Sequence, residues 1–181
     1  MELQGKTIGI LAENHYEDLE LWYPYYRFIE AGATVKIIGS GTEETYKGKY
    51  GYPVTPEVDI IEVDPPDFDA IIIPGGFAPD FMRRVPRMIE FVRASVLLGK
   101  IVAAICHGPW MLASANVLHG KKATCFFAIA DDIRNAGAHY LDQEVVRDGN
   151  IITSRKPSDL PAFCREIIQT LNNDNAVNNG T

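Results

Sequence analysis

The sequence predicts an α/β protein in which helices cover both faces of a mainly parallel sheet. Two short runs, 69–73 and 101–105, are apolar almost throughout, as in strands buried on both faces, whereas a half-buried strand would alternate apolar and polar residues. Segments of helical composition follow both runs, and strands that alternate with helices are typical of parallel sheets. With 181 residues, the chain is long enough to bury a substantial core without disulfides or metal ions.

The N-terminal region predicts a strand, a helix and a second strand. The strands are expected over 6–12 and 34–38, and the helix over 19–32. The apolar side chains that recur at helical spacing are expected to face the core, and they are Leu19, Trp22, Tyr26 and Ile29. Pro24 lies inside this segment and predicts a late start or a kink, because proline cannot donate a helical hydrogen bond.

Glycine and proline divide the middle of the chain. Residues 46–54 predict short strands or a hairpin at the sheet edge, since they combine glycines with a proline. The buried strand at 69–73 runs into Pro74-Gly75-Gly76. A polar loop is expected over 77–86, and a helix over 87–98 that ends before a glycine.

The C-terminal part of the chain predicts further strands and helices. The expected elements are a strand over 123–127, a short helix over 131–136, a β-hairpin over 144–154 and a last helix over 159–171. Asp148-Gly149-Asn150 has the composition of a hairpin turn. We therefore expect one domain over 1–171 and a frayed, asparagine-rich tail over 172–181.

Cys106 stands at the point where the apolar strand 101–105 stops. His107, Gly108 and Pro109 follow at once and lead into a helix-forming stretch, so the segment predicts a nucleophile elbow, in which a tight turn lifts one reactive side chain above the sheet. The positive end of a helix favours a thiolate, so we expect a lowered pKa for the Cys106 thiol. The competing interpretation is a buried cysteine that packs as a small hydrophobe.

Three loops are expected to meet at one pocket, because ligands of parallel sheets bind at the carboxyl ends of the strands. They are the loop at Glu17, the loop at Pro74-Gly75-Gly76 and the turn at Cys106. The peptide N–H of His107 is expected to act as an oxyanion donor. His15 is the other histidine expected near this pocket and is a candidate for contact with substrate.

Composition limits the classes of function. The chain carries 24 acidic and 17 basic residues, and a net charge of −7 argues against nucleic acid or an anionic membrane as a partner. No apolar run is long enough for a membrane span and the N-terminus lacks the pattern of a signal peptide, so a cytoplasmic location is expected. Three scattered cysteines form neither a disulfide framework nor a zinc pattern, and neither a metal ion nor a cofactor is expected.

Five ordered blocks of sequence resemble the PfpI intracellular peptidase branch of the ThiJ/PfpI superfamily, in register over nearly the whole chain. The blocks are 16–20, 74–80, 104–109, 131–137 and 148–155. This resemblance implies a flavodoxin-like three-layer sandwich with Cys106 as the nucleophile and Glu17 as the acid that contacts its sulfur. It also implies an oxyanion hole formed by the backbone N–H groups of Gly76 and His107.

The resemblance further implies that two subunits share the site. In the PfpI branch, an acid from the neighbouring subunit, at the position that matches Asp80, orients the ring of His107, so a homo-oligomer, either a dimer or a hexamer, is expected. The PfpI peptidase has the longer Glu there, and it has Tyr at the position that matches Phe126, which carries no hydroxyl to donate a proton or orient a substrate. Both differences weaken the interpretation of this protein as a peptidase. Neither of them affects Cys106 or Glu17.

We expect chemistry on small reactive carbonyls or on glycated proteins and peptides, of the kind attributed to glutathione-independent glyoxalases and protein deglycases. If Glu17 and Cys106 share one proton, the acid donates to a thiolate that adds to an aldehyde such as methylglyoxal. The first alternative is an intracellular cysteine peptidase with an intersubunit Cys-His-acid triad. The second is a redox-sensing stress protein or chaperone, since the same acid would stabilise an oxidised sulfur. A glutamine amidotransferase needs a downstream His-x-Glu, which His139-Tyr140-Leu141 does not supply.

Overall fold

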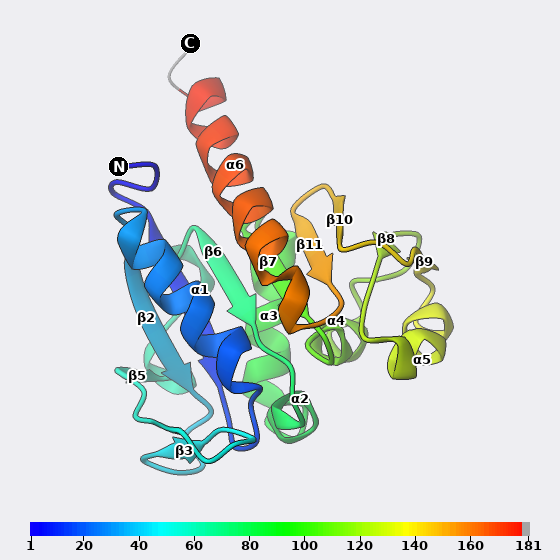
Figure 1. The fold of residues 1–181 in the computed structure, drawn as a ribbon, viewed down its shortest axis with the longest axis horizontal. Coiled ribbons are helices and arrows are strands. Elements are labelled where there is room, and N and C mark those ends of the chain that lie inside the picture. Colours follow the sequence, from blue (N-terminus) through cyan, green and yellow to red (C-terminus); the bar gives the residue numbers. More distant parts are fainter. Residues whose placement is uncertain (179–181) are drawn as a thin grey trace.

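A seven-stranded, mainly parallel sheet forms the centre of the molecule (Figure 1). The computed structural model describes the backbone of residues 1–178 and the side chains of residues 1–173. In spatial order the strands are β10 (Val145–Asp148), β11 (Ile151–Ser154), β7 (Ile101–Ile105), β6 (Ala70–Ile73), β1 (Thr7–Ala12), β2 (Thr34–Gly39) and β5 (Val58–Asp59). Of these, β10 runs antiparallel to β11, in the hairpin predicted around Asp148-Gly149-Asn150.

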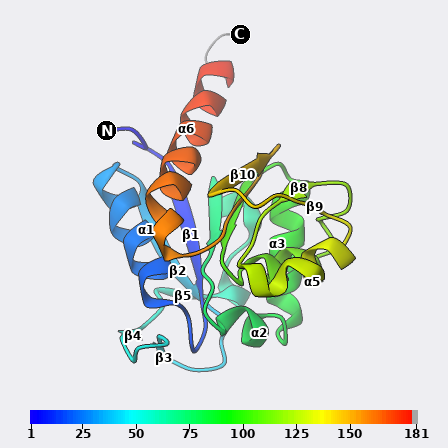
Figure 2. The same cartoon turned by 45° about the vertical axis from the view of Figure 1, so that its right-hand side comes forward.

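Helices pack on both faces of this sheet, as the sequence predicts (Figures 1 and 2). Helices α1 (Asp18–Glu30) and α6 (Leu160–Asn178) lie side by side on one face. Helices α3 (Pro86–Leu97) and α4 (Pro109–Ser114) contact each other on the opposite face. The shorter elements are β3 (Tyr46–Lys47), β4 (Pro53–Val54), α2 (Ala78–Met82), β8 (Lys122–Ala123), α5 (Ala130–Asn135), β9 (His139–Tyr140) and four turns of 3₁₀ helix, Ile60–Glu62, Pro65–Asp67, Phe127–Ile129 and Pro157–Asp159.

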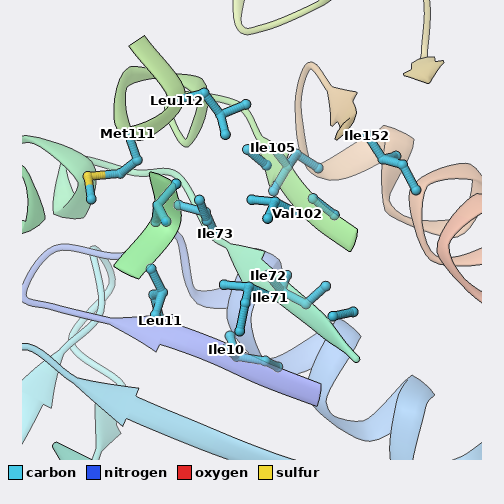
Figure 3. Packing of buried hydrophobic residues seen from close by; sticks show 14 of the residues in the cluster. Ile10, Leu11, Ile71, Ile72, Ile73, Val102, Ile105, Met111, Leu112 and Ile152 are labelled. Atoms are coloured by element: carbon cyan, nitrogen blue, oxygen red, sulfur yellow. The ribbon is translucent and has the colours of Figure 1, made fainter. Parts of the chain in front are cut away.

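The core is built on the three central strands β1, β6 and β7. Their residues are buried almost without exception, which is why their sequences are continuously apolar instead of alternating. Figure 3 shows Ile73 and Ile105, at the ends of β6 and β7, in one apolar layer with Met111 and Leu112 of α4. This close packing holds rigid the strand ends from which the Gly75 and Cys106 loops start.

The face of α1 that packs on the sheet is not the predicted one. The buried side chains of this helix are Glu20, Leu21, Pro24 and Phe28. Leu19, Tyr26 and Ile29 of the predicted face are instead 58%, 62% and 43% exposed. Helix α1 carries apolar residues on two faces. The buried face also contains Glu20, so its sequence pattern is less clearly apolar than that of the exposed face. Burial of Glu20 is tolerated because the N–H of Gly75 donates to its carboxyl at 2.7 Å.

Two loop regions also differ from the prediction. Residues 77–86 contain α2 instead of the expected polar loop, with Pro79 in the first turn of this helix, where proline is tolerated. Of residues 123–127, only Ala123 belongs to a strand, β8, and a turn of 3₁₀ helix begins at Phe127. The chain turns there because the Phe126 N–H donates to the carbonyl oxygen of Cys106 at 2.9 Å.

The remaining elements agree with the prediction in type but differ in extent. Residues 46–54 form the expected hairpin, but its two strands pair only with each other and do not extend the edge of the main sheet. Helix α6 continues to Asn178, so the described part of the expected tail, 172–178, is helical, and residues 179–181 lie outside the described residues. Within the described residues, none of the helices combines the length and apolar character needed to cross a bilayer.

Candidate active site

Cys106 lies in a strained turn between β7 and α4. Its φ of 61° falls in the left-handed region that residues other than glycine avoid. The Cys106 N–H donates to Ser154 O at 3.0 Å, and the Gly108 N–H donates to Ile105 O at 2.8 Å, so the turn is held on both sides. Glycine is required at position 108, because a Cβ there would lie 2.5 Å from Ile73 O. This geometry is that of a nucleophile elbow.

The loop after β6 reaches the elbow through two glycines. Gly76 has a φ of 72°, and a Cβ there would lie 2.3 Å from the carbonyl oxygen of His15. An isolated antiparallel bridge joins Gly76 to Tyr16, and a Cβ at Gly75 would lie 2.6 Å from Cys106 Cβ. The three loops that the sequence predicts to converge therefore meet at one point.

The structure places Glu20, and not the predicted Glu17, beside the Cys106 sulfur. A Cβ built on Gly75 would lie 2.6 Å from both Cys106 Cβ and Glu20 Oε2, so the two side chains face each other across this glycine. Glu20 is fully buried, and its Oε1 has no hydrogen-bond partner of ordinary geometry among the described residues. Its carboxyl lies near enough to the thiol of Cys106 for each group to shift the pKa of the other. The acid that the family resemblance implies is thus one helical turn further along α1.

Burial controls the protonation of this pair. It raises the pKa of Glu20 to about 8, against the opposing effect of the Gly75 N–H, so Glu20 carries a proton at neutral pH. Burial also raises the pKa of the Cys106 thiol, and a charged Glu20 raises it further, whereas the backbone N–H groups of Gly76 and His107 lower it. This direction is opposite to the lowering expected from the helix N-terminus. Attack by this sulfur requires a neighbouring group that accepts the thiol proton.

His107 is placed to accept that proton. Its Nδ1 lies 3.2 Å from Cys106 Sγ. Burial, assisted by the positive charge of Lys49, lowers the pKa of His107, so the imidazole is neutral at pH 7. The ring stacks on Phe126 at 5.2 Å and meets the edge of Trp110 at 5.0 Å. These contacts hold the imidazole against the sulfur.

Glu17 contacts a lysine that the sequence did not indicate. Lys49 Nζ lies 3.2 Å from Glu17 Oε2. Lys49 comes from the turn between β3 and β4, and Asp18 fixes this turn by accepting hydrogen bonds from the backbone N–H groups of Tyr50 and Tyr52 at 3.0 and 3.3 Å. The position of Lys49 thus depends on tertiary contacts, and no local sequence pattern in the hairpin predicts them.

Cys106 and His107 line a pocket of about 990 Å³ that also receives the other predicted contact residues. His15, stacked on Phe81 at 5.7 Å, and Phe126 both form part of its wall. The remaining lining residues are Glu17, Asp18, Leu19, Lys49, Tyr50, Gly76, Phe77 and Pro157. Cys106 itself is 8% exposed, so a substrate reaches the sulfur from this pocket.

Asp80 lies apart from this arrangement within the chain. It is on α2, forms an ion pair with Arg84 and is not among the residues that line the pocket. Among the described residues, no carboxylate hydrogen-bonds the ring of His107, so the orientation of this ring by Asp80 of a neighbouring subunit stays a prediction. The described side chains also contain no group of three or more His, Cys, Asp or Glu residues arranged to hold a metal ion.

Known proteins resemble this chain over most of its length. The model of the DJ-1/PfpI family matches residues 6–170. The chain is 45% identical to Deglycase PfpI of Pyrococcus furiosus over 91% of this chain and 98% of that protein. It is 44% identical to the putative cysteine protease YraA of Bacillus subtilis over 92% of this chain and 99% of that protein. A solved two-domain protein of Anabaena variabilis, with DJ-1/ThiJ/PfpI-like and ferritin-like domains, matches with a TM-score of 0.90 and 46% identity over 92% of this chain and 50% of that chain.

Proposed function

We propose, on the premise that this chain belongs to the DJ-1/PfpI family, that it uses the Cys106 thiol to act on reactive carbonyls and on their adducts with proteins. The predicted membership of the PfpI branch and the flavodoxin-like sandwich are confirmed. The Pyrococcus relative is named a deglycase, which supports the same class of activity here. The observation that carries the proposal is the position of the Cys106 sulfur, 3.2 Å from His107 Nδ1 and next to the protonated Glu20, at the base of a pocket.

The first step is addition of sulfur to an aldehyde. As the bond between Sγ of Cys106 and the aldehyde carbon forms, His107 Nδ1 takes the thiol proton and the carbonyl oxygen becomes an alkoxide. The backbone N–H groups of Gly76 and His107, which point to the sulfur, lie where they can stabilise this oxygen. Protonation of the alkoxide gives a hemithioacetal. For an adduct on a protein amine, the sulfur replaces the amine on the same carbon, and the amine leaves with the proton that His107 took from the thiol.

The second step moves hydrogen within the bound fragment. With methylglyoxal, loss of the proton from the former aldehyde carbon and protonation of the neighbouring carbon convert the hemithioacetal into a lactoyl thioester. One carbon is oxidised and its neighbour is reduced, so no external oxidant is needed. His107 is the base for this transfer, and Glu20 stabilises the sulfur by donating its proton. Water then hydrolyses the thioester to lactate and restores the Cys106 thiol.

The test compares the wild type with Cys106→Ala, Glu20→Gln and Glu20→Ala on methylglyoxal and on its adduct with N-acetylarginine. We expect Cys106→Ala to abolish both activities. Glu20→Gln retains a donor and should lose less activity than Glu20→Ala, which we expect to be about ten- to a hundred-fold slower. Turnover by Cys106→Ala at the wild-type rate would eliminate the proposal.

A cysteine peptidase is the second candidate, favoured by the contact between Cys106 and His107 and by the name of the Bacillus relative. This reaction requires an acid that orients His107, and the candidate is Asp80 of a neighbouring subunit. Cleavage of a fluorogenic peptide that is lost in both Cys106→Ala and Asp80→Asn would support it. Cleavage that persists in Asp80→Asn would remove the intersubunit triad from consideration.

We also infer that the chain forms a homo-oligomer. The exposed apolar residues on the outer face of α1, among them Leu19 and Tyr26, support this inference because large exposed apolar patches are typical of interfaces. Light scattering after size-exclusion chromatography tests it, and a monomer at micromolar concentration would contradict it. The cytoplasmic location stays a prediction from the sequence.

A further inference from the structure

Glu17 is a buried acid that the proposed chemistry does not use. Its side chain is 10% exposed, and it lines the same pocket as the Cys106 sulfur. Its backbone is fixed, because the Glu17 N–H donates to Gly75 O at 3.2 Å and the Glu17 carbonyl accepts from Glu20 N–H at 3.0 Å. This carboxylate is therefore a fixed part of the pocket wall.

The partner of Glu17 is far less constrained. The backbone of Lys49 is held, since its N–H donates to Tyr16 O at 2.8 Å, but its side chain is 53% exposed. Ion pairs with one exposed member are weak, because the lysine can return to water at little cost. When the pair separates, Lys49 moves into solvent, and Glu17 keeps its place and presents an unpaired carboxylate to the pocket.

The other acid of the pocket cannot take this role. Asp18 uses both of its carboxylate oxygens on the backbone N–H groups of Tyr50 and Tyr52. The pocket thus offers one carboxylate, Glu17, whose partner can be displaced. The pocket that Glu17 lines also exposes the rings of Phe77, Phe81, Phe126 and Tyr50. A carboxylate among aromatic rings suits a guanidinium group, which pairs with a carboxylate through two hydrogen bonds and stacks on aromatic faces.

We propose that Glu17 recognises a cationic group of the substrate, and that Lys49 occupies the place of this cation in the free protein. This inference rests on the proposed function. Within that function, it names carbonyl adducts of arginine side chains as better substrates than carbonyl adducts of thiols. Glu17 acts as a specificity-determining residue, while Cys106, His107 and Glu20 carry the chemistry. Lys49 acts as a competitor, so its removal strengthens the binding of cations.

The experiment measures binding without turnover. Cys106 is alkylated with iodoacetamide, a neutral reagent, in the presence of n-butylguanidinium, n-butanol or butyrate, and the Cys106 peptide is quantified by mass spectrometry. These compounds carry straight alkyl chains of three or four carbons and differ in charge. The variants are Glu17→Gln and Lys49→Met, and Lys47→Met is the matched control, since Lys47 is an exposed lysine of the same hairpin that does not line the pocket.

We expect n-butylguanidinium to protect Cys106 of the wild type more strongly than n-butanol or butyrate. The concentration for half protection should fall about three-fold in Lys49→Met. It should rise about ten-fold or more in Glu17→Gln, which loses a charged acceptor. Lys47→Met should match the wild type.

Three results would overturn the inference. They are equal protection in the wild type and Glu17→Gln, weaker guanidinium binding in Lys49→Met, or strong protection by butyrate that disappears in Lys49→Met. The last result would assign anion recognition to Lys49. Because the readout is alkylation, a protein without deglycase activity can still pass this test, and an active deglycase can still fail it.

Discussion

The proton on Glu20 makes stability depend on pH in a way that Glu20→Gln should remove. Burial raises the pKa of Glu20 from 4.5 to about 8 in the folded protein. Between these values the folded protein keeps a proton that the unfolded chain releases, so the contribution of Glu20 to stability is complete below pH 4.5 and is lost as pH rises through 8. The difference corresponds to about 5 kcal/mol in the free energy of unfolding. Gln is neutral in both states and contributes no such dependence.

The assay is urea unfolding of the wild type and Glu20→Gln between pH 5 and 9, followed by the fluorescence of the two tryptophans. Subtracting the two free energies of unfolding cancels the titration of all groups that the variants share. We expect the wild type to lose about 4 kcal/mol relative to Glu20→Gln between pH 5 and pH 9, with most of the loss complete by pH 8. A constant difference over this range would refute the assignment of the shared proton to Glu20.

Four further predictions concern other groups. Gly76→Ala should lower the free energy of unfolding by about 2 kcal/mol or more, since its φ of 72° is strained for alanine and the Cβ would meet backbone atoms, and thermal unfolding measures this. The acid limb of kcat/KM should lie below pH 6.5, because burial lowers the pKa of His107, and a limb above pH 7 would contradict this. His107→Gln should slow alkylation of Cys106, and an unchanged alkylation rate would show that His107 does not assist the thiol. Asp159→Asn should lower the free energy of unfolding, measured in urea, by about 3 kcal/mol, because the buried Asp159 accepts hydrogen bonds from Arg155 at 2.9 and 3.2 Å. A loss below about 1 kcal/mol would show that this ion pair does not stabilise the fold.

The sheet could be predicted from the sequence because the apolar pattern of each central strand depends directly on which of its faces are buried. A run such as 101–105 is apolar on both sides only when both faces of a strand are covered, and this is a local signal. The turn at Cys106 was equally accessible, since a buried strand, a reactive residue and a helix with Pro109 in its first turn follow each other without a gap.

The acid beside the sulfur could not be chosen in the same way. Glu17 and Glu20 lie one turn apart at the start of α1, and the choice depends on which helix face is buried. The apolar residues Leu19 and Tyr26 favoured the wrong face, because the correct one includes an acid whose burial depends on the N–H of Gly75, distant in the sequence. The spacing to Leu21, Pro24 and Phe28 was the available signal.

Lys49 was missed for a related reason. Its place at the pocket follows from hydrogen bonds between the β3–β4 turn and Asp18, and such pairings carry no periodic pattern. Hairpins that pair only with themselves give no sheet register from which their position could be inferred. The fold was therefore predictable from local patterns, whereas the charges around the nucleophile required tertiary structure.

The central claim is that the carbonyl carbon of the substrate becomes bonded to Cys106 Sγ, and acid quenching during turnover of methylglyoxal tests it most directly. Thioesters survive acid, so digestion and mass spectrometry should find the peptide that contains Cys106 increased by the mass of one methylglyoxal, and hydroxylamine should remove this mass. Lactate production without any modification of Cys106, or with the label on another residue, would contradict the account.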